Sequence, residues 1–564
     1  MNGQLSIIKG TNDKPAASAE LAAMFAGAEN YQGQLLVGYP LIGSPDGRHA
    51  IDAVWISPTK GIIIFDLIEG NDPAGYDFRQ DDAANKLEAR LRTHRELTEK
   101  RTLLIPIRTV SFAPGVADPR RFEVPGYNLA SNEESLKSIL DREKWAESNH
   151  RTYEVALSAI QSISTIRSSK AKRVTNDEQS RGAKLKRLED SIATLDNRQG
   201  KAVLETVEGV QRIRGLAGSG KTIVLALKAA YLHAQHPDWR IAVTFNTRSL
   251  KGQFRRLINN FSVEQAGEEP DWDQLRILNA WGAPGGAERD GIYHEFCKSH
   301  GIEYFDLRAA KQIAVSGHEF AKVCEKALGE MREKKPLYDA ILVDEAQDFP
   351  PAFLRICYEA LSDKKRLVYA YDELQNLSND SMPPPEDLFG KNADGSPRVS
   401  FRGNAPSAPQ QDIILSKCYR NSRPVLVTAH ALGFGIYREP LRKGLSGLVQ
   451  MFDHPNLWEE IGYRLRAGEL REGEYVDLYR PEETSPVFLE NHSPVEDLIS
   501  FHKFENEDEQ AEWVSSAIRS NLEDEELRHD DIVVINPDPP QKKLGDPFMT
   551  ASTSGVCPIS HGTS

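Results

Sequence analysis

The sequence predicts an α/β protein that contains more than one domain. Between residues 193 and 378, apolar runs of strand length alternate with helical segments, which is the pattern of a parallel sheet covered by helices. A second set of β-type runs, interrupted by one helical stretch, lies within residues 1–135. The length of 564 residues also exceeds that of one domain, because domains usually contain about 100–200 residues.

Composition narrows the class of protein. Hydrophobic residues make up 40% of the chain and charged residues 27%, which excludes wholesale disorder. The formal net charge of −14 excludes a protein that binds nucleic acid through its overall charge, whereas a local basic groove stays compatible with it. The chain has no apolar run of about 18 residues and no secretion signal, and its five cysteines form no CxxC pair. We therefore expect a cytoplasmic protein with no membrane partner and no zinc site.

The N-terminal part, residues 1–135, is expected to form an α/β domain of modest size. Its charged helical stretch is predicted at 77–100 and its strands at 34–41, 50–57, 61–68 and 102–112. Residues 136–192 lack such runs and end in a segment rich in Lys and Arg. We interpret these residues as a helical, basic linker whose charges face solvent rather than DNA.

Three further segments follow. Residues 193–411 are predicted to form one α/β domain that ends in a long loop (379–411) rich in Pro, Gly, Ser and Asn. Residues 412–540 are predicted to begin a second α/β unit, with a helix near 507–521 and a strand at 531–536. Residues 541–564 have no periodicity and no apolar run, so we expect an unstructured tail.

The segment GLAGSGKT fits the pattern GxxxxGK[ST] of a phosphate-binding loop. It follows an apolar run and opens a predicted helix, so its backbone N–H groups and the helix dipole would face a polyphosphate. Lys221 would place its charge on the β and γ phosphates, and Thr222 would offer its hydroxyl to Mg²⁺. The loop residues expected to surround the phosphates are Gly215, Leu216, Ala217, Gly218, Ser219 and Gly220.

The second motif is acidic. It is Asp344-Glu-Ala-Gln-Asp348, and it follows the apolar run LYDAILV. A carboxylate at the end of a parallel strand lies in the crevice where α/β sheets bind ligands. We expect Asp344 to hold Mg²⁺, directly or through water, and Glu345 to orient and deprotonate the attacking water. The alternative is that these acids only cap a helix.

Together these two motifs resemble superfamily 1 DNA helicases of the UvrD/Rep group, and the resemblance covers roughly residues 193–538. It implies two RecA-like lobes with ATP and Mg²⁺ between them. Gln199, in a Q-motif-like LDNRQ, would select adenine. Gln375, in YDELQ, would sense the γ phosphate, and Arg420, in CYRNS, would reach that phosphate from the second lobe.

The same resemblance implies a DNA partner. The segment VTFNTR resembles motif Ia, so Phe245, Asn246 and Arg248 would contact single-stranded DNA. The implied activity is an ATP-dependent helicase or translocase that moves 3′-to-5′ on single-stranded or partly duplex DNA. Tyr371 stands where the group usually has Gly, and no aromatic-Arg-Gly run follows Gln375; Tyr371 or Phe389 is the substitute for base stacking that we consider.

Motifs V and VI of the group, with their second arginine finger, are not found after the predicted strand at 531–536. The second lobe is therefore expected to be incomplete, and hydrolysis to be slow unless a second chain completes it. This leaves an alternative function, an ATP-switched DNA-binding or regulatory protein that does not unwind DNA.

Within residues 1–135, Asp52 and Asp66 lie on successive predicted strands joined by a tight turn. This layout resembles the nuclease-related (NERD-like) domain, a relative of the PD-(D/E)xK nucleases, and Glu20 is the helical acid that the resemblance would add. The position of the catalytic Lys holds Ile68 instead. We therefore favour remnants of a metal site over an active nuclease, while a nuclease coupled to an ATPase is the third interpretation.

Overall fold

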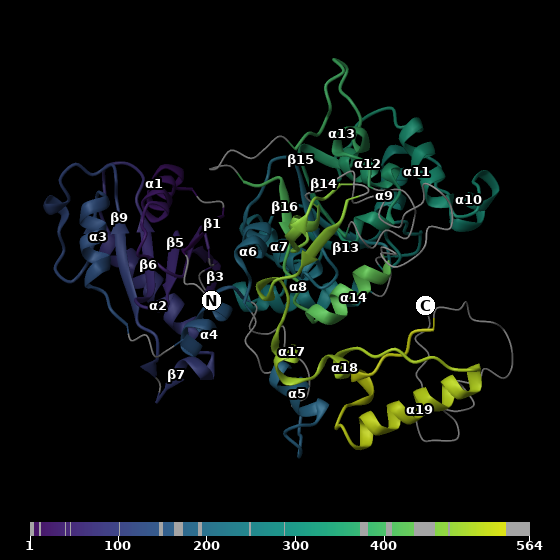
Figure 1. Ribbon diagram of the computed structural model, residues 1–564. Coiled ribbons are helices and arrows are strands. Elements are labelled where there is room, and N and C mark those ends of the chain that lie inside the picture. The colour runs from purple at the N-terminus through teal and green to yellow at the C-terminus, as the bar shows by residue number, and fades with distance from the viewer. Residues whose placement is uncertain are drawn as a thin grey trace. The chain divides into compact units, whose positions relative to one another are not determined.

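The computed structural model describes residues 5–10, 13–39, 41–44, 47–100, 102–145, 150–162, 173–189, 194–247, 250–286, 288–372, 382–401, 409–433, 457–471 and 474–536. By internal contacts the chain forms two compact units (Figure 1). The first comprises residues 1–166, 192–418 and 456–462, and the second comprises residues 167–191, 419–455 and 463–564. The expected α/β class is confirmed, because the two larger sheets contain parallel strands and are covered by helices.

The first of these sheets has six strands in the order β1-β2-β5-β6-β9-β10. The pairs β2–β5 and β5–β6 are antiparallel, and the pairs β1–β2, β6–β9 and β9–β10 are parallel. The predicted strands at 34–41, 50–57, 61–68 and 102–112 contain β2, β5, β6 and β9, and the sheet has β1 and β10 in addition. The strands are Ser6–Lys9, Gln34–Val37, Ala53–Ser57, Gly61–Leu67, Ile107–Phe112 and Leu129–Ala130, in the order of their labels.

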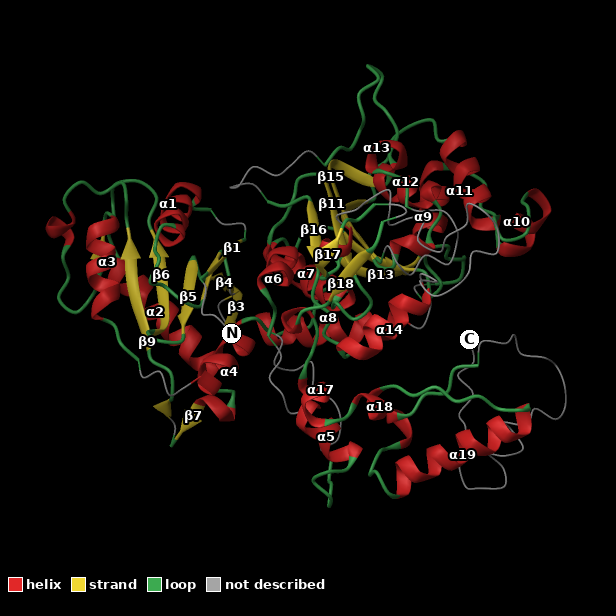
Figure 2. Cartoon of the chain, in the orientation of Figure 1, coloured by secondary structure: helices red, strands yellow, loops and turns green. Residues whose placement is uncertain are grey.

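Every residue of β5 and β6 is buried because helices cover both faces of this sheet (Figure 2). Ile63, Phe65 and Leu67 pack with α1 (Pro15–Ala26) and α3 (Glu133–Arg142). Ile62 and Ile64 point the other way, toward α2 (Tyr76–Leu91) and α4 (His150–Ile160). Two small hairpins complete this part of the chain, formed by β3 (Leu41–Ser44) with β4 (Gly47–Ala50) and by β7 (Thr98–Glu99) with β8 (Thr102–Leu103).

The second six-stranded sheet has the order β13-β12-β14-β15-β11-β16, and all of its pairs are parallel. The strand at Asp412–Leu415 (β16), expected to open the second unit, instead pairs with β11 and extends this sheet. In parallel sheets all strand ends of one kind meet at one edge. The other strands are β11 Val210–Gly215, β12 Ile241–Phe245, β13 Leu275–Asn279, β14 Tyr338–Val343 and β15 Leu361–Tyr371.

Helices cover this sheet on both faces too. α6 (Asn197–Leu204), α7 (Lys221–Gln235) and α8 (Leu250–Ala266) contribute to the apolar cluster on one face. The cluster on the other face contains residues of four helices, which are α9 (Ile292–His300), α10 (Leu307–Ile313), α11 (Glu319–Glu330) and α12 (Pro351–Glu359), and is joined by Leu388 of α13 (Pro385–Leu388). Short α16 (Leu457–Glu460) also belongs to this unit.

The second unit is mainly helical in its described residues, with one hairpin of β17 (Arg464–Gly468) and β18 (Val476–Tyr479). The predicted helix near 507–521 is confirmed as α19, whereas the predicted strand at 531–536 is wrong. Residues 532–536 pair with no described strand, and Val533 and Ile535 are 77% and 83% exposed. The backbone N–H and C=O groups of a strand require hydrogen bonds to a neighbouring strand. An apolar run in the sequence does not show that such a neighbour exists. The helices are α5 Arg181–Glu189, α14 Arg423–Gly433, α17 Phe488–His492, α18 Val495–Leu498 and α19 Glu507–Glu523.

A buried lysine joins two helices of the first unit. Lys228 lies on α7 and is 1% exposed. Its Nζ donates hydrogen bonds to the carbonyls of Ala202 (3.0 Å), Val203 (3.4 Å) and Glu205 (2.7 Å), where α6 ends. The last carbonyls of a helix lack intrahelical partners, so Lys228 caps α6 from the neighbouring helix. Burial lowers the pKa of Lys228 to about 7, and the charge of Glu205 opposes this shift.

Lys228→Met should remove a pH dependence of stability. The folded-state pKa of about 7 lies below the ordinary 10.5, so at intermediate pH the unfolded chain holds a proton that the folded chain has released. The stability of the wild type should therefore rise, relative to the variant, by about 1.4 kcal/mol per pH unit above pH 7. Urea unfolding of both proteins between pH 7 and pH 9.5 measures this difference, and a difference that is independent of pH would contradict the assignment.

Candidate functional site

The glycine-rich loop joins the end of β11 to the start of α7. Gly218 and Gly220 have φ angles of 81° and 89°, in the left-handed region that favours glycine. A Cβ on Gly215 would lie 2.5 Å from Ser219 Oγ and 3.0 Å from Leu415 Cβ, so the loop and β16 also require glycine there. The conformation thus depends on all three glycines of the motif.

Lys221 lies inside this loop and its side chain is 6% exposed. Its Nζ donates to the carbonyls of Gly215 (2.9 Å) and Leu216 (3.1 Å) and lies 3.7 Å from Asp372 Oδ2. The ammonium is therefore held by loop carbonyls and by one carboxylate at the end of β15. A buried cation beside turned glycines is the arrangement that receives a polyphosphate.

Asp344 lies against the same helix terminus. Thr222 Oγ1 donates to Asp344 Oδ2 at 2.7 Å, although the two residues belong to separate motifs of the sequence. Asp344 is fully buried, and burial, together with the charge of Glu345, raises its pKa to about 6, while Thr222 and Lys221 act in the opposite direction. A carboxylate and a hydroxyl in contact are hard oxygen donors of the kind that Mg²⁺ prefers, so these residues fit that ion.

Glu345, the second acid of this motif, is linked through Gln347 to the end of a neighbouring strand. Glu345 adopts a φ of 49°, and its carboxylate accepts a hydrogen bond from Gln347 Nε2 at 2.7 Å. Gln347 Oε1 in turn accepts from the backbone N–H of Asp372 at 3.1 Å. Gln347 therefore ties the end of β14 to the end of β15. Neither Gln347 nor Asp372 was predicted to act in the site, although Gln347 belongs to the acidic motif 344–348.

Gln199 contacts the glycine-rich loop. Its Nε2 donates to the carbonyl of Ser219 at 2.9 Å, and its backbone N–H is capped by Asp196. Cys418 Sγ donates to another loop carbonyl, that of Ala217, at 3.3 Å. Side chains from α6 and from the segment after β16 thus hold the loop backbone at two of its carbonyls.

The residues expected to contact DNA differ in their exposure to solvent. Asn246 is exposed and lies beside Asp348; burial and the charge of Glu345 raise the pKa of Asp348, and the Asn246 side chain opposes this shift. Phe245 is 1% exposed and stacks on Phe254 with ring centroids 5.7 Å apart. Phe245 is therefore part of the core and offers no face to a base, which corrects its expected role.

Base stacking by Tyr371 or Phe389 is also incompatible with the structure, because each is 2% exposed and both pack around Tyr369. Gln375 and Arg248 lie outside the described residues. Arg420 is an exposed residue of the second unit, and its predicted role stays a prediction.

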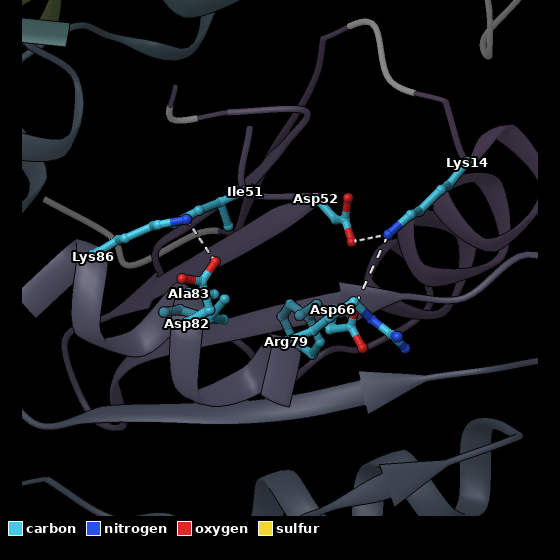
Figure 3. Close-up of a pocket in the computed structure, with 10 residues that line it drawn as sticks. Lys14, Ile51, Asp52, Asp66, Arg79, Asp82, Ala83 and Lys86 are labelled. Carbon is cyan, nitrogen blue, oxygen red and sulfur yellow. Dashed lines mark hydrogen bonds and ion pairs between the residues drawn. The ribbon is translucent and has the colours of Figure 1, made fainter. Parts of the chain in front are cut away.

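The acidic pair of the N-terminal sheet lines a separate cavity of about 150 Å³ (Figure 3). Asp52 pairs with Lys14 at 2.5 Å, and Asp66 pairs with Arg79 at 2.9 Å. Glu20 is exposed on α1 and is not among the lining residues, so the expected third acid is not brought to the pair. Among the described residues no group of three His, Cys, Asp or Glu side chains is arranged to hold a metal ion.

Comparison with known proteins adds no family, since no family model matches the chain and a search of curated proteins gives no significant match. Within the described part of the chain, no helix combines the length and apolar character needed to cross a bilayer.

Asp344→Asn should stabilise the protein at pH 8. The folded-state pKa of about 6 lies above the ordinary 3.8, so the folded chain binds more protons in this window and its stability falls as pH rises from about 4 to 6. The substitution removes that penalty, and we expect a gain of about 1–3 kcal/mol at pH 8 that disappears below pH 4. Urea unfolding measures the gain, and a variant less stable than the wild type at pH 8 would contradict the account of this carboxylate.

Proposed function

We propose that the chain is a P-loop ATPase with a RecA-like first lobe, and that it uses ATP hydrolysis to move 3′-to-5′ along single-stranded DNA. The observation that carries the ATPase part is the contact between Thr222 and Asp344 beside the buried Lys221. The DNA part rests on the resemblance to superfamily 1 helicases. One strand, β15, lies between β11 and β14, so the glycine-rich loop and Asp344 end up at the same edge of the sheet.

The residues of the site divide the work of binding and hydrolysis. Lys221 would exchange its contacts with the loop carbonyls for contacts with the β and γ phosphates. Thr222 and Asp344 would hold Mg²⁺, which supplies charge neutralisation on the phosphates when it is bound. Glu345 would orient a water molecule and accept its proton.

Coupling to movement involves the residues around this centre. Gln347 connects Glu345, after β14, with the end of β15. A displacement of one of these strand ends would therefore displace the other. Gln199 donates to the loop carbonyl of Ser219, which puts its amide beside the loop that would bind the phosphates. By resemblance, Gln199 would select adenine, and Gln375 and Arg420 would respond to the γ phosphate.

A second candidate is an ATP-switched DNA-binding protein that does not unwind DNA. One observation favours it: the only sheet among the described residues of the second unit is the hairpin of β17 and β18, and β16 belongs to the first unit. Both candidates bind ATP, and they differ in whether hydrolysis produces movement.

Lys221→Ala should abolish ATP binding, whereas Glu345→Gln should retain binding and lower hydrolysis by more than about 100-fold. The first change removes the cation of the loop, and the second removes only the proton acceptor. Binding of a fluorescent ATP analogue and release of phosphate with single-stranded DNA measure the two effects. The exposed residues Lys298 and Glu333 provide matched controls, as Lys298→Ala and Glu333→Gln. Wild-type ATP binding by Lys221→Ala would contradict the proposal.

Strand displacement separates the two candidates. A helicase should unwind a duplex with a 3′ single-stranded tail when ATP is present, and it should fail on a duplex with a 5′ tail. An ATP-switched binder should change its affinity for the tail without releasing the strand. Native gels and fluorescence anisotropy on the same substrates measure both outcomes, and unwinding from the 5′ tail alone would contradict the expected polarity.

A further inference from the structure

The acidic pair of the N-terminal domain is built into the sheet. Ala53 of β5 pairs with Phe65 of the antiparallel β6, so Asp52 and Asp66 follow at the next opposed position. Directly opposed positions in a sheet bring side chains close together, and two carboxylates there repel each other unless a cation lies between or beside them.

Lys14 supplies that cation. It lies just before α1, and its Nζ is 2.5 Å from Asp52 Oδ2 and 3.9 Å from Asp66 Oδ1. Figure 3 shows Lys14 extending toward both acids, and Arg79 Nε lies 2.9 Å from Asp66 Oδ1. The site therefore contains two carboxylates and two cations that belong to the chain itself.

The other contacts of the acids are also satisfied within the chain. Asp52 Oδ2 accepts the backbone N–H of Leu67 at 2.8 Å, and Asp66 Oδ2 accepts the hydroxyl of Ser111 at 2.7 Å. The next acid along the chain, Glu69, accepts the backbone N–H groups of Ala16 and Ala17 and so caps the N-terminus of α1. Burial raises the pKa of Asp52, and the charge of Lys14 opposes this shift.

These contacts do not fit the Mg²⁺ site that the nuclease-related resemblance implies. Mg²⁺ requires six oxygen ligands at about 2.0–2.1 Å, and the ammonium of Lys14, which lies against both carboxylates, would repel it. Glu20, the acid that would complete such a site, is exposed and outside the cavity.

We propose that Lys14 is the resident cation of this site. Its ammonium takes the place of a divalent ion between Asp52 and Asp66, so the N-terminal domain needs no metal and does not cleave DNA with Mg²⁺. The ion pair instead fixes the start of α1 to the sheet, together with Glu69. Removal of Lys14 opens a divalent cation site on Asp52 and Asp66. This proposal is independent of the proposed ATPase activity.

Binding of Mn²⁺ to the nucleotide-free full chain, counted by electron paramagnetic resonance of the free ion, tests the proposal. The wild type and Asp52→Asn should bind the same number of ions, because Lys14 already occupies the site. Lys14→Ala should bind about one more Mn²⁺ per chain than the wild type. The double variant Lys14→Ala/Asp52→Asn should lose that additional ion.

Lys86→Ala is the matched control, because Lys86 lines the same cavity but pairs with a single carboxylate, Asp82, at 2.7 Å. It should add no Mn²⁺ site. Circular dichroism checks that each variant is folded. The proposal is overturned if the wild type binds one more Mn²⁺ than Asp52→Asn, a comparison that does not depend on the folding of any Lys14 variant. It is also overturned if folded Lys14→Ala gains no ion, or if the wild type nicks DNA with Mg²⁺ and Asp52→Asn does not.

Discussion

The hydrogen bond between Thr222 and Asp344 is the contact on which the rest of the first unit's candidate site depends. It joins the start of α7 to the end of β14, and it does so around a carboxylate that has no exposure to solvent. A buried carboxylate is unfavourable unless it is hydrogen bonded or paired. Lys221, next to Thr222 in the sequence, lies 3.7 Å from Asp372, and Asp372 donates its backbone N–H to Gln347, so the ends of neighbouring strands are linked beside this contact. A polar site of this kind is unfavourable for stability alone, which is the usual condition of sites that bind a charged ligand.

The two acidic sites of the chain use lysine in different ways. Lys221 lies 3.7 Å from Asp372 and makes its shorter contacts with loop carbonyls, which an anion can replace. Lys14 pairs directly with Asp52 at 2.5 Å and lies 3.9 Å from Asp66. An anion can replace the carbonyl contacts of Lys221, which suits the proposed binding of a polyphosphate. Lys14 is instead paired with a carboxylate of the chain, which suits it to hold elements of the fold together.

Much of the fold could be predicted from the sequence because the strands are short apolar runs between turn residues. β6, β12 and β14 each coincide with such a run, and the motif containing Gly220 marks the start of α7. The pattern failed at 531–536, where an apolar run has no described strand beside it, and at Asp412–Leu415, where the pattern gave the strand but not the sheet to which it belongs. Local pattern contains no information on pairing partners. For the same reason Phe245 was expected at a surface, although its ring stacks in the core. Lys14 could not be foreseen either, because it is 38 positions from Asp52 and no motif includes it.

The most direct test of the proposed nucleotide site is a crystal structure of the chain with an ATP analogue and Mn²⁺, with the Mn²⁺ located by anomalous scattering. We expect the phosphates within the loop 216–220, the ammonium of Lys221 turned from the loop carbonyls toward them, and the metal ion at Thr222 and Asp344. Phosphates bound elsewhere, or a metal ion remote from both residues, would contradict it.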